Sequence, residues 1–123
     1  MGVMSFRELT VWQKAMDLTI EIYRLVKKLP REELYDLSSQ MRRAAVSIPS
    51  NIAEGQSRKS SKEFANFLSI AQGSKAELET QLLICNRLNY LTEDDTASTM
   101  KLLAEIGKMI TAIIPKLTST SNH

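Results

Sequence analysis

Four long stretches of the chain repeat apolar residues at every third or fourth position, and short polar connectors separate these stretches. The apolar stretches cover residues 10–28, 32–53, 60–90 and 93–117. Such spacing is typical of amphipathic α-helices that bury one face. No stretch of the sequence has the alternation of a strand or the turn residues of a hairpin. The sequence therefore predicts an all-α fold.

The connectors between these helices are so short that consecutive helices should pack side by side. They are residues 29–31, 56–59 and 91–94. Short links favour antiparallel neighbours, so we expect an up-down-up-down four-helix bundle. A length of 123 residues suits one domain. We expect that domain to span residues 1–123, with flexible ends at 1–8 and 118–123.

Local signals predict where the helices begin and end. The residue before Pro30 is pushed out of the helical region, which ends the first helix. Gly55 is expected to end the second helix, since glycine is favoured just beyond a helix C-terminus. Ser60 and Glu63 fit a capping box at the start of the third helix. Thr92 precedes the fourth.

Pro49 lies in the middle of the second predicted helix. It has no N–H to donate to the carbonyl of Ala45, and its ring crowds that carbonyl. We therefore expect the second helix to bend within the turn that precedes Pro49, near residues 45–47. The carbonyl of Ala45 should then accept a hydrogen bond from a serine or from water.

A polar stripe runs along the same helix through Arg43, Ser47, Asn51 and Glu54. At roughly 1.5 Å per residue, Arg43 and Glu54 are about 16 Å apart along the helix and cannot pair with each other. Each is expected to find its partner on another helix, a second subunit or a ligand. Two interpretations stay open: a polar network that fixes the register of the bundle, or a functional surface such as a subunit contact or a phosphate-binding patch.

Positive charge is concentrated in residues 42–62, although the whole chain carries only +2. This segment holds one acidic residue, Glu54, and five basic residues: Arg42, Arg43, Arg58, Lys59 and Lys62. A charged run is often only a solvated face. The alternative is a surface that contacts the phosphates of a nucleic acid.

The residue types needed for most catalytic and metal sites are missing. The only histidine is the terminal His123, which argues against nucleophile–base triads, the common zinc sites and di-iron bundles. The only cysteine, Cys85, lies on an apolar helix face and predicts an inert thiol rather than a nucleophile or a disulfide. We therefore expect no enzyme activity, no cofactor and no metal.

The sequence also bears on location. Its N-terminus lacks the pattern of a signal peptide, and no run of 18 apolar residues is present to span a membrane. We expect a cytoplasmic protein.

The first helix has more apolar residues than one face of a bundle requires. Its main stripe holds Trp12, Met16, Tyr23 and Val26, and a second stripe holds Val11, Leu18 and Leu25. Both stripes cannot face the same three helices. We therefore expect one of them to be covered by another subunit.

Three segments resemble the bacterial four-helix bundle proteins encoded in intervening sequences of large-subunit ribosomal RNA genes. These segments are FRELTVWQKA (residues 6–15), QMRRAAVSIPSNIAEG (residues 40–55) and SKEFANFLSIAQGSKAELETQL (residues 61–82). The chain is also similar to the accessory protein of diversity-generating retroelements, a pentamer of four-helix bundles that binds nucleic acid and a reverse transcriptase. The resemblance implies a small homo-oligomer, with a pentameric ring as one form, and a basic surface that binds RNA.

Two functions remain after these exclusions. The first is a non-catalytic oligomer that binds structured RNA or another nucleic acid through residues 42–62. The second is a scaffold or adaptor that binds a protein partner through exposed helix faces.

Overall fold

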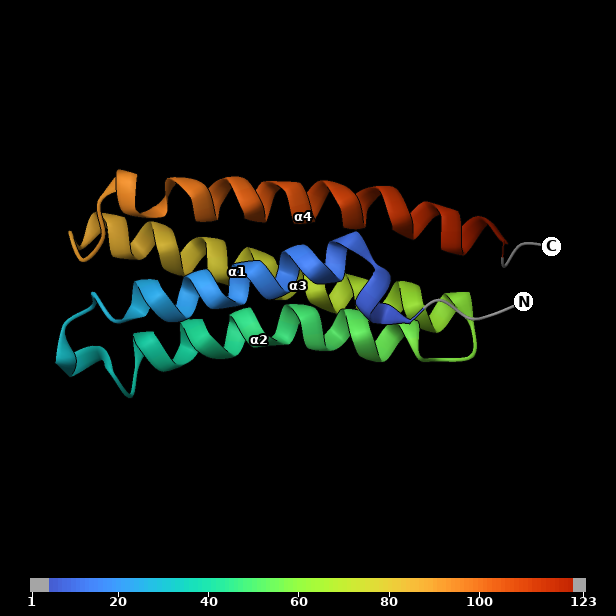
Figure 1. Ribbon diagram of the computed structural model, residues 1–123, viewed down its shortest axis with the longest axis horizontal. Coiled ribbons are helices and arrows are strands. Elements are labelled where there is room, and N and C mark those ends of the chain that lie inside the picture. The colour runs from blue at the N-terminus through green and yellow to red at the C-terminus, as the bar shows by residue number, and fades with distance from the viewer. Residues whose placement is uncertain (1–4, 121–123) are drawn as a thin grey trace.

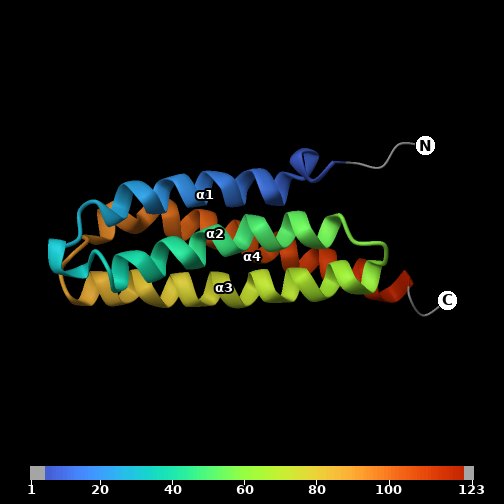
Figure 2. The same cartoon turned by 90° about the horizontal axis from the view of Figure 1, so that it is seen from below.

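The computed structural model describes residues 5–120, and four long helices fill most of that range (Figure 1). The elements are η1 (Phe6–Glu8), α1 (Thr10–Val26), η2 (Arg31–Glu33), α2 (Leu37–Gln56), α3 (Ser61–Arg87) and α4 (Glu93–Thr120), where η marks a short 3-10 helix. Each long helix runs opposite to the one before it (Figures 1 and 2). The prediction of an all-α four-helix bundle is confirmed.

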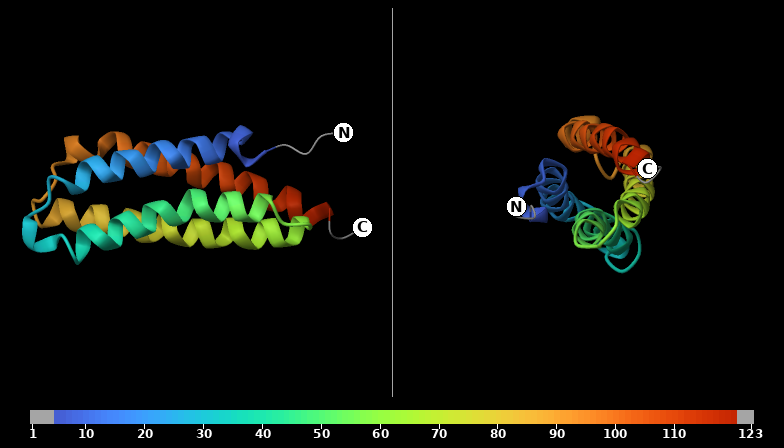
Figure 3. Two further views of the ribbon diagram at one scale, coloured as in Figure 1. Left: turned by 60° about the horizontal axis from the view of Figure 1, so that its bottom comes forward. Right: turned by 90° about the vertical axis from the view of Figure 1, so that its right-hand side faces the viewer.

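The four helices enclose one core, as the end-on view shows (Figure 3, right). Helix α1 packs against α2 and α4, and α3 completes the bundle between the same two neighbours. The α2–α3 pair shares the most extensive contact, and the α1–α4 pair shares the least. The α2–α3 connection lies at the same end of the bundle as η1 and the end of α4 (Figure 1). The predicted flexible ends lie partly outside the described residues, and the described parts of them include η1 and the last residues of α4.

Helix α1 buries a different stripe from the one that the sequence marked as the main one. Val11 and Leu18 are almost fully buried, whereas Met16 and Tyr23 are 39% and 43% exposed. The reason is geometric: Leu18 points to the centre of the bundle, while Met16 and Tyr23 lie along the outer edge where α1 meets α2. Met16 and Tyr23 of the predicted main stripe therefore lie at the surface, whereas Val26 of the same stripe is buried.

Side chains cap the starts of α3 and α4, and the Ser60 half of the predicted capping box is present at α3. The Ser60 hydroxyl accepts a hydrogen bond from the Glu63 backbone N–H at 3.1 Å. At α4, the Thr92 hydroxyl accepts from the Asp95 N–H at 3.0 Å, and the Asp95 carboxylate accepts from the Thr92 N–H at 2.8 Å. Side-chain oxygens thus satisfy backbone donors that the first helical turn leaves without partners.

Gly55 does not end α2, contrary to the sequence prediction. It lies inside the helix, and no glycine of the described residues has a positive φ. Its role is to let α3 approach, because a Cβ at this position would lie 2.6 Å from the Cβ of Phe67. Glycine is required here by the distance between two helices rather than by a turn.

The carbonyl that Pro49 leaves without a helical donor meets a side chain of α1. The Thr19 hydroxyl lies 3.2 Å from the carbonyl oxygen of Ala45 and 2.8 Å from that of Ala15. The acceptor is therefore served by a threonine of a neighbouring helix, where the sequence suggested a serine or water. Helix α2 is continuous through Pro49, and the expected bend stays a prediction.

We expect Thr19→Val to lower the free energy of unfolding by about 1–2 kcal/mol, because it removes a donor from a buried carbonyl. Pro49→Ala restores a backbone N–H for the Ala45 carbonyl. The cost of Thr19→Val should therefore be smaller in the Pro49→Ala background. Urea unfolding of the parent, the two single variants and the double variant measures this coupling. An equal cost in both backgrounds would show that Thr19 does not serve the carbonyl.

Gly55→Ala and Gly73→Ala form a matched pair on the packed and open sides of the bundle. Gly55→Ala should destabilise the protein by about 1–3 kcal/mol, because the added methyl group overpacks the α2–α3 contact. At Gly73 a Cβ would meet no atom within 4 Å. Gly73→Ala should therefore raise the stability of the single chain by up to about 1 kcal/mol through helix propensity alone. Thermal and urea unfolding check both signs.

Candidate functional surfaces

The five basic residues of the 42–62 segment fall into two groups. Arg42 and Arg43 lie on the first half of α2, and Arg58, Lys59 and Lys62 surround the α2–α3 connection. Sixteen residues separate Arg42 from Arg58, which is about 24 Å along a helix. The structure therefore presents two separate basic groups instead of one continuous patch.

At the α2–α3 connection, Arg58 is held in place and the two lysines are not. The Arg58 guanidinium lies 2.7 Å from the Glu54 carboxylate and 5.0 Å from the centre of the Phe67 ring. Lys59 and Lys62 are exposed, and within residues 5–120 their side chains have no hydrogen bond or ion pair. The two lysines therefore carry positive charge that no ion pair neutralises.

The Arg58 contact also corrects the expectation for Glu54. Its partner is Arg58, which lies four residues further along the chain, just beyond the end of α2. Opposite charges four residues apart often form an ion pair along a helix, so this pair could have been predicted from the sequence. Arg43 is exposed and has no hydrogen bond or ion pair among the described residues.

The polar stripe of α2 forms a network through two of its four predicted members. The hydroxyls of Ser47 and Ser74 are 2.8 Å apart and join α2 to α3. The Asn51 amide donates to the Ser47 carbonyl at 2.7 Å and lies 2.9 Å from its hydroxyl. Arg43 and Glu54 are not part of it. Ser74 was missed as a partner because it lies in a stripe whose other members are apolar.

Two hollows run along the outer seam between α1 and α2 and meet at Val46; we call them the α1–α2 groove. The first, of about 340 Å³, is lined by Trp12, Met16, Thr19, Val46, Pro49, Ser50 and Ala53. The second, of about 360 Å³, is lined by Tyr23, Ser39, Arg42, Arg43, Val46 and Ser47. Apolar side chains dominate one half of the groove, and two arginines flank the other.

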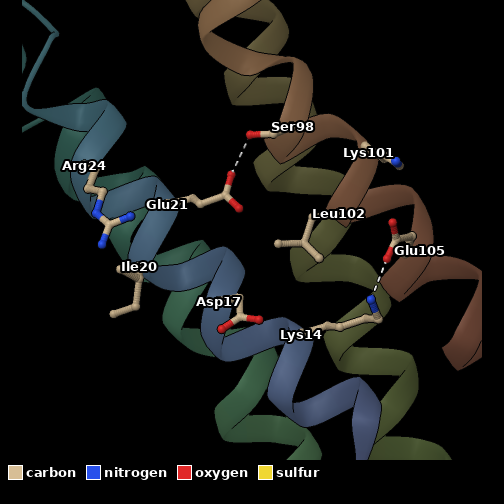
Figure 4. A pocket seen from close by; sticks show the side chains of 9 residues that line it. All are labelled: Lys14, Asp17, Ile20, Glu21, Arg24, Ser98, Lys101, Leu102 and Glu105. Carbon is tan, nitrogen blue, oxygen red and sulfur yellow. Dashed lines mark hydrogen bonds and ion pairs between the residues drawn. The ribbon is translucent and has the colours of Figure 1, made fainter.

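A larger, polar hollow of about 510 Å³ lies between α1 and α4 (Figure 4). It is lined by Lys14, Asp17, Ile20, Glu21, Arg24, Ser98, Lys101, Leu102 and Glu105. Across it, Lys14 pairs with Glu105 at 2.6 Å, and Glu21 accepts hydrogen bonds from the hydroxyls of Ser98 and Thr99. Three basic and three acidic residues line this hollow, so it favours neither anions nor cations.

The Cys85 thiol is unsuited to nucleophilic chemistry. It is fully buried, with its sulfur 3.7 Å from that of Met41. Burial, and to a lesser degree the negative charge of Glu33, raise its pKa to about 11. The thiolate, which is the reactive form, is therefore scarce at neutral pH.

Residues 5–120 contain neither a cluster of metal ligands nor a membrane-spanning helix. No group of three or more histidine, cysteine, aspartate or glutamate side chains there could hold a metal ion. None of the helices in that range is both long enough and apolar enough to span a membrane.

Comparisons with known proteins match this chain to a family and to a solved structure. The family model described as 23S rRNA-intervening sequence protein matches residues 7–112. The chain is also similar to the crystal structure of a protein with unknown function from the S23 ribosomal protein family from Bacteroides thetaiotaomicron VPI-5482. The identity is 31% and the TM-score 0.79, and the match covers 85% of this chain and 98% of that one. No curated protein matches the chain.

Acid should lower the stability of the bundle slightly, because an ion pair joins the chain just after α1 to the first turn of α4. Lys28 lies 2.8 Å from Asp95, and this hydrogen bond, together with the Thr92 N–H, lowers the pKa of Asp95 from 3.8 to about 2. A carboxylate whose pKa is lowered by folding stabilises the folded state above its unfolded pKa. That stabilisation is lost as pH falls from about 4 to about 2.

The matching variant is Asp95→Asn, which keeps an oxygen for the Thr92 N–H but removes the charge. Its urea midpoint should be below that of the parent at pH 6, and the difference should shrink as pH falls from about 4 to about 2. A difference that stays constant over this range would show that the Asp95 charge does not contribute.

Proposed function

Because the chain belongs to the 23S rRNA-intervening sequence protein family, we propose that it is a non-catalytic, self-associating bundle that binds structured RNA or another nucleic acid. The proposed contact is the α2–α3 connection, with Arg58, Lys59 and Lys62. The observation that carries this proposal is the exposure of Lys59 and Lys62 without an acidic partner among the described residues.

The contact is proposed to reach phosphates rather than base edges. Lysine side chains are flexible point charges that suit phosphate oxygens. Stacking of bases would need exposed aromatic rings beside the cations, and the nearest ring, Phe67, is half-buried under Arg58. Binding should therefore depend steeply on salt and only weakly on sequence.

Self-association supports this role despite the small net charge of +2. An assembly repeats the α2–α3 connection once in every copy, so weak contacts add through avidity. By analogy with the retroelement accessory protein, a closed ring of five copies is the form that we propose.

The non-catalytic and cytoplasmic parts of the proposal have separate support. The one cysteine has a raised pKa and is buried, and the one histidine is the terminal residue. A lone unpaired cysteine also suits a reducing compartment such as the cytoplasm.

A protein scaffold is the second candidate function. The α1–α2 groove supports it, because exposed apolar side chains such as Met16 and Val46 are typical of surfaces that bind another protein. In this case the basic residues would serve only as a solvated face.

The double variant Lys59→Glu/Lys62→Glu tests the nucleic-acid contact. Arg58 is left in place because it pairs with Glu54 and covers Phe67. Affinity for a structured RNA hairpin at low salt should fall at least tenfold. The slope of log K against log salt should fall by about one for each lysine that contacts a phosphate. Fluorescence anisotropy over a salt series measures both quantities.

The matched control is Lys101→Glu/Lys108→Glu, which changes the net charge equally on the exposed side of α4. It should bind RNA much more tightly than the α2–α3 variant. Equal losses in the two variants would indicate a general charge effect. If the parent shows no salt-sensitive binding, the nucleic-acid role fails and the scaffold role takes its place.

A further inference from the structure

Packing within the chain does not explain why position 73 is a glycine. It lies in the interior of α3, where glycine is less favourable than alanine by about 1 kcal/mol. A Cβ at Gly73 would meet no atom within 4 Å, whereas a Cβ at Gly55 would lie 2.6 Å from the Cβ of Phe67. Gly55 shows what such a glycine does in this fold: it lets another helix come close. The open face at Gly73 is therefore suited to the close approach of a second molecule.

Exposed apolar side chains lie on the same face of α3 as Gly73, from Ile70 to Leu88 at the C-terminal cap of the helix. Residues 70, 77 and 84 recur every seven positions, which places them on one side of a helix. Ile70, Ile84 and Leu88 are 52%, 41% and 51% exposed, so these aliphatic side chains are unusually accessible. Glu77 lies among them, and its side chain has no ion pair among the described residues. We call Ile70, Gly73, Glu77, Ile84 and Leu88 the α3 stripe.

The α1–α2 groove has the complementary properties. It is concave where the stripe is a ridge, and Met16 and Val46 supply exposed apolar surface along it. Arg42 and Arg43 flank it, and neither has an ion pair in the described part of the chain, although the Arg42 guanidinium donates to the Leu34 carbonyl at 3.5 Å. A groove with unpaired arginines thus matches a helix ridge with an unpaired glutamate. Within one chain the two cannot meet, because α3 packs against α2 and α4 through its other face.

We propose that the α3 stripe of one copy docks into the α1–α2 groove of a second copy, so that the chain associates head to tail. This interface rests on the self-association in the proposed function and gives it a specific partner surface. It does not depend on RNA binding, because Lys59 and Lys62 belong to neither face.

The consequence of this arrangement is that each copy has two unlike faces. Two unlike faces make a heterologous interface, which closes into a ring or continues as a filament. A symmetric dimer, by contrast, would use the same face twice and leave the other one uncovered.

Two variants that each block one face provide the test. Gly73→Leu places a branched side chain on the α3 stripe, and Val46→Glu places a carboxylate in the groove, opposite the expected position of Glu77. The parent should associate, and each variant alone should have the 13.9 kDa mass of a single chain. An equal mixture should form a dimer of twice that mass, because one intact groove and one intact stripe remain in it.

Light scattering on size-exclusion peaks measures these masses, in nuclease-treated samples at about 0.5 M salt, where RNA contacts are weakened. A parent that stays monomeric overturns the proposal. So does a mixture that stays monomeric. Val46→Glu that dimerises alone would show stripe-to-stripe contact, and Gly73→Leu that dimerises alone would show groove-to-groove contact, and either result would also overturn it.

Controls separate loss of association from loss of folding. Ala97→Leu adds an exposed leucine on α4, away from both faces, and should keep the mass of the parent. Circular dichroism and urea midpoints should show that Gly73→Leu is folded, since its side chain meets open space. Ile84→Glu is a second variant that blocks the α3 stripe and can replace Gly73→Leu in the test. The variant Lys59→Glu/Lys62→Glu should also keep the parent mass, so the interface and the RNA contact can fail independently.

Discussion

The close approach of α2 to α3 is the contact on which the rest of the structure depends. Three observations locate it along the two helices: Gly55 lies against Phe67, the Ser47 and Ser74 hydroxyls meet, and Met41 faces Cys85. Apolar packing supplies most of the stabilisation, while the glycine and the serine pair determine how near the helices come and in which register. With α2 and α3 held in this way, the connection between them is positioned, and with it the Arg58–Phe67 contact and the two exposed lysines.

Helix α1 is attached by a different combination of forces. Leu18 and Ile22 enter the common core, and the Thr19 hydroxyl reaches the carbonyl that Pro49 leaves without a helical donor. Towards α4 the packing is less extensive, and ion pairs such as Lys14–Glu105 bridge the seam. Exposed ion pairs contribute little each. The burial of the stripe that holds Val11, Leu18 and Leu25 therefore fixes α1, whereas Met16 and Tyr23 of its other stripe remain at the surface beside α2.

These two attachments separate the candidate functions in space. Lys59 and Lys62, the cations of the proposed nucleic-acid contact that have no ion pair, lie at one end of the bundle, where α2 joins α3. The exposed apolar surface lies along the sides, in the α1–α2 groove and on the α3 stripe. An assembly built through the sides would leave the basic ends accessible, so association and nucleic-acid contact need not compete for the same residues.

Features that depend on residues close in the chain could be predicted from the sequence. The spacing of apolar residues predicted the four helices, and Ser60 with Glu63 predicted the start of α3, because a cap joins residues three apart. The Arg58–Glu54 ion pair could have been predicted in the same way, because its two residues are four apart. The family resemblance was also readable, because its segments are continuous in sequence.

Only the tertiary structure decided features that depend on the distance between helices. It showed that Gly55 admits a neighbouring helix instead of ending its own, and that α1 buries Leu18 and exposes Met16. Gly55 and Gly73 are both helical glycines in the sequence, yet one is packed and the other faces open space. Helical periodicity tells which residues share a face, but which face meets a neighbour depends on how all four helices pack together.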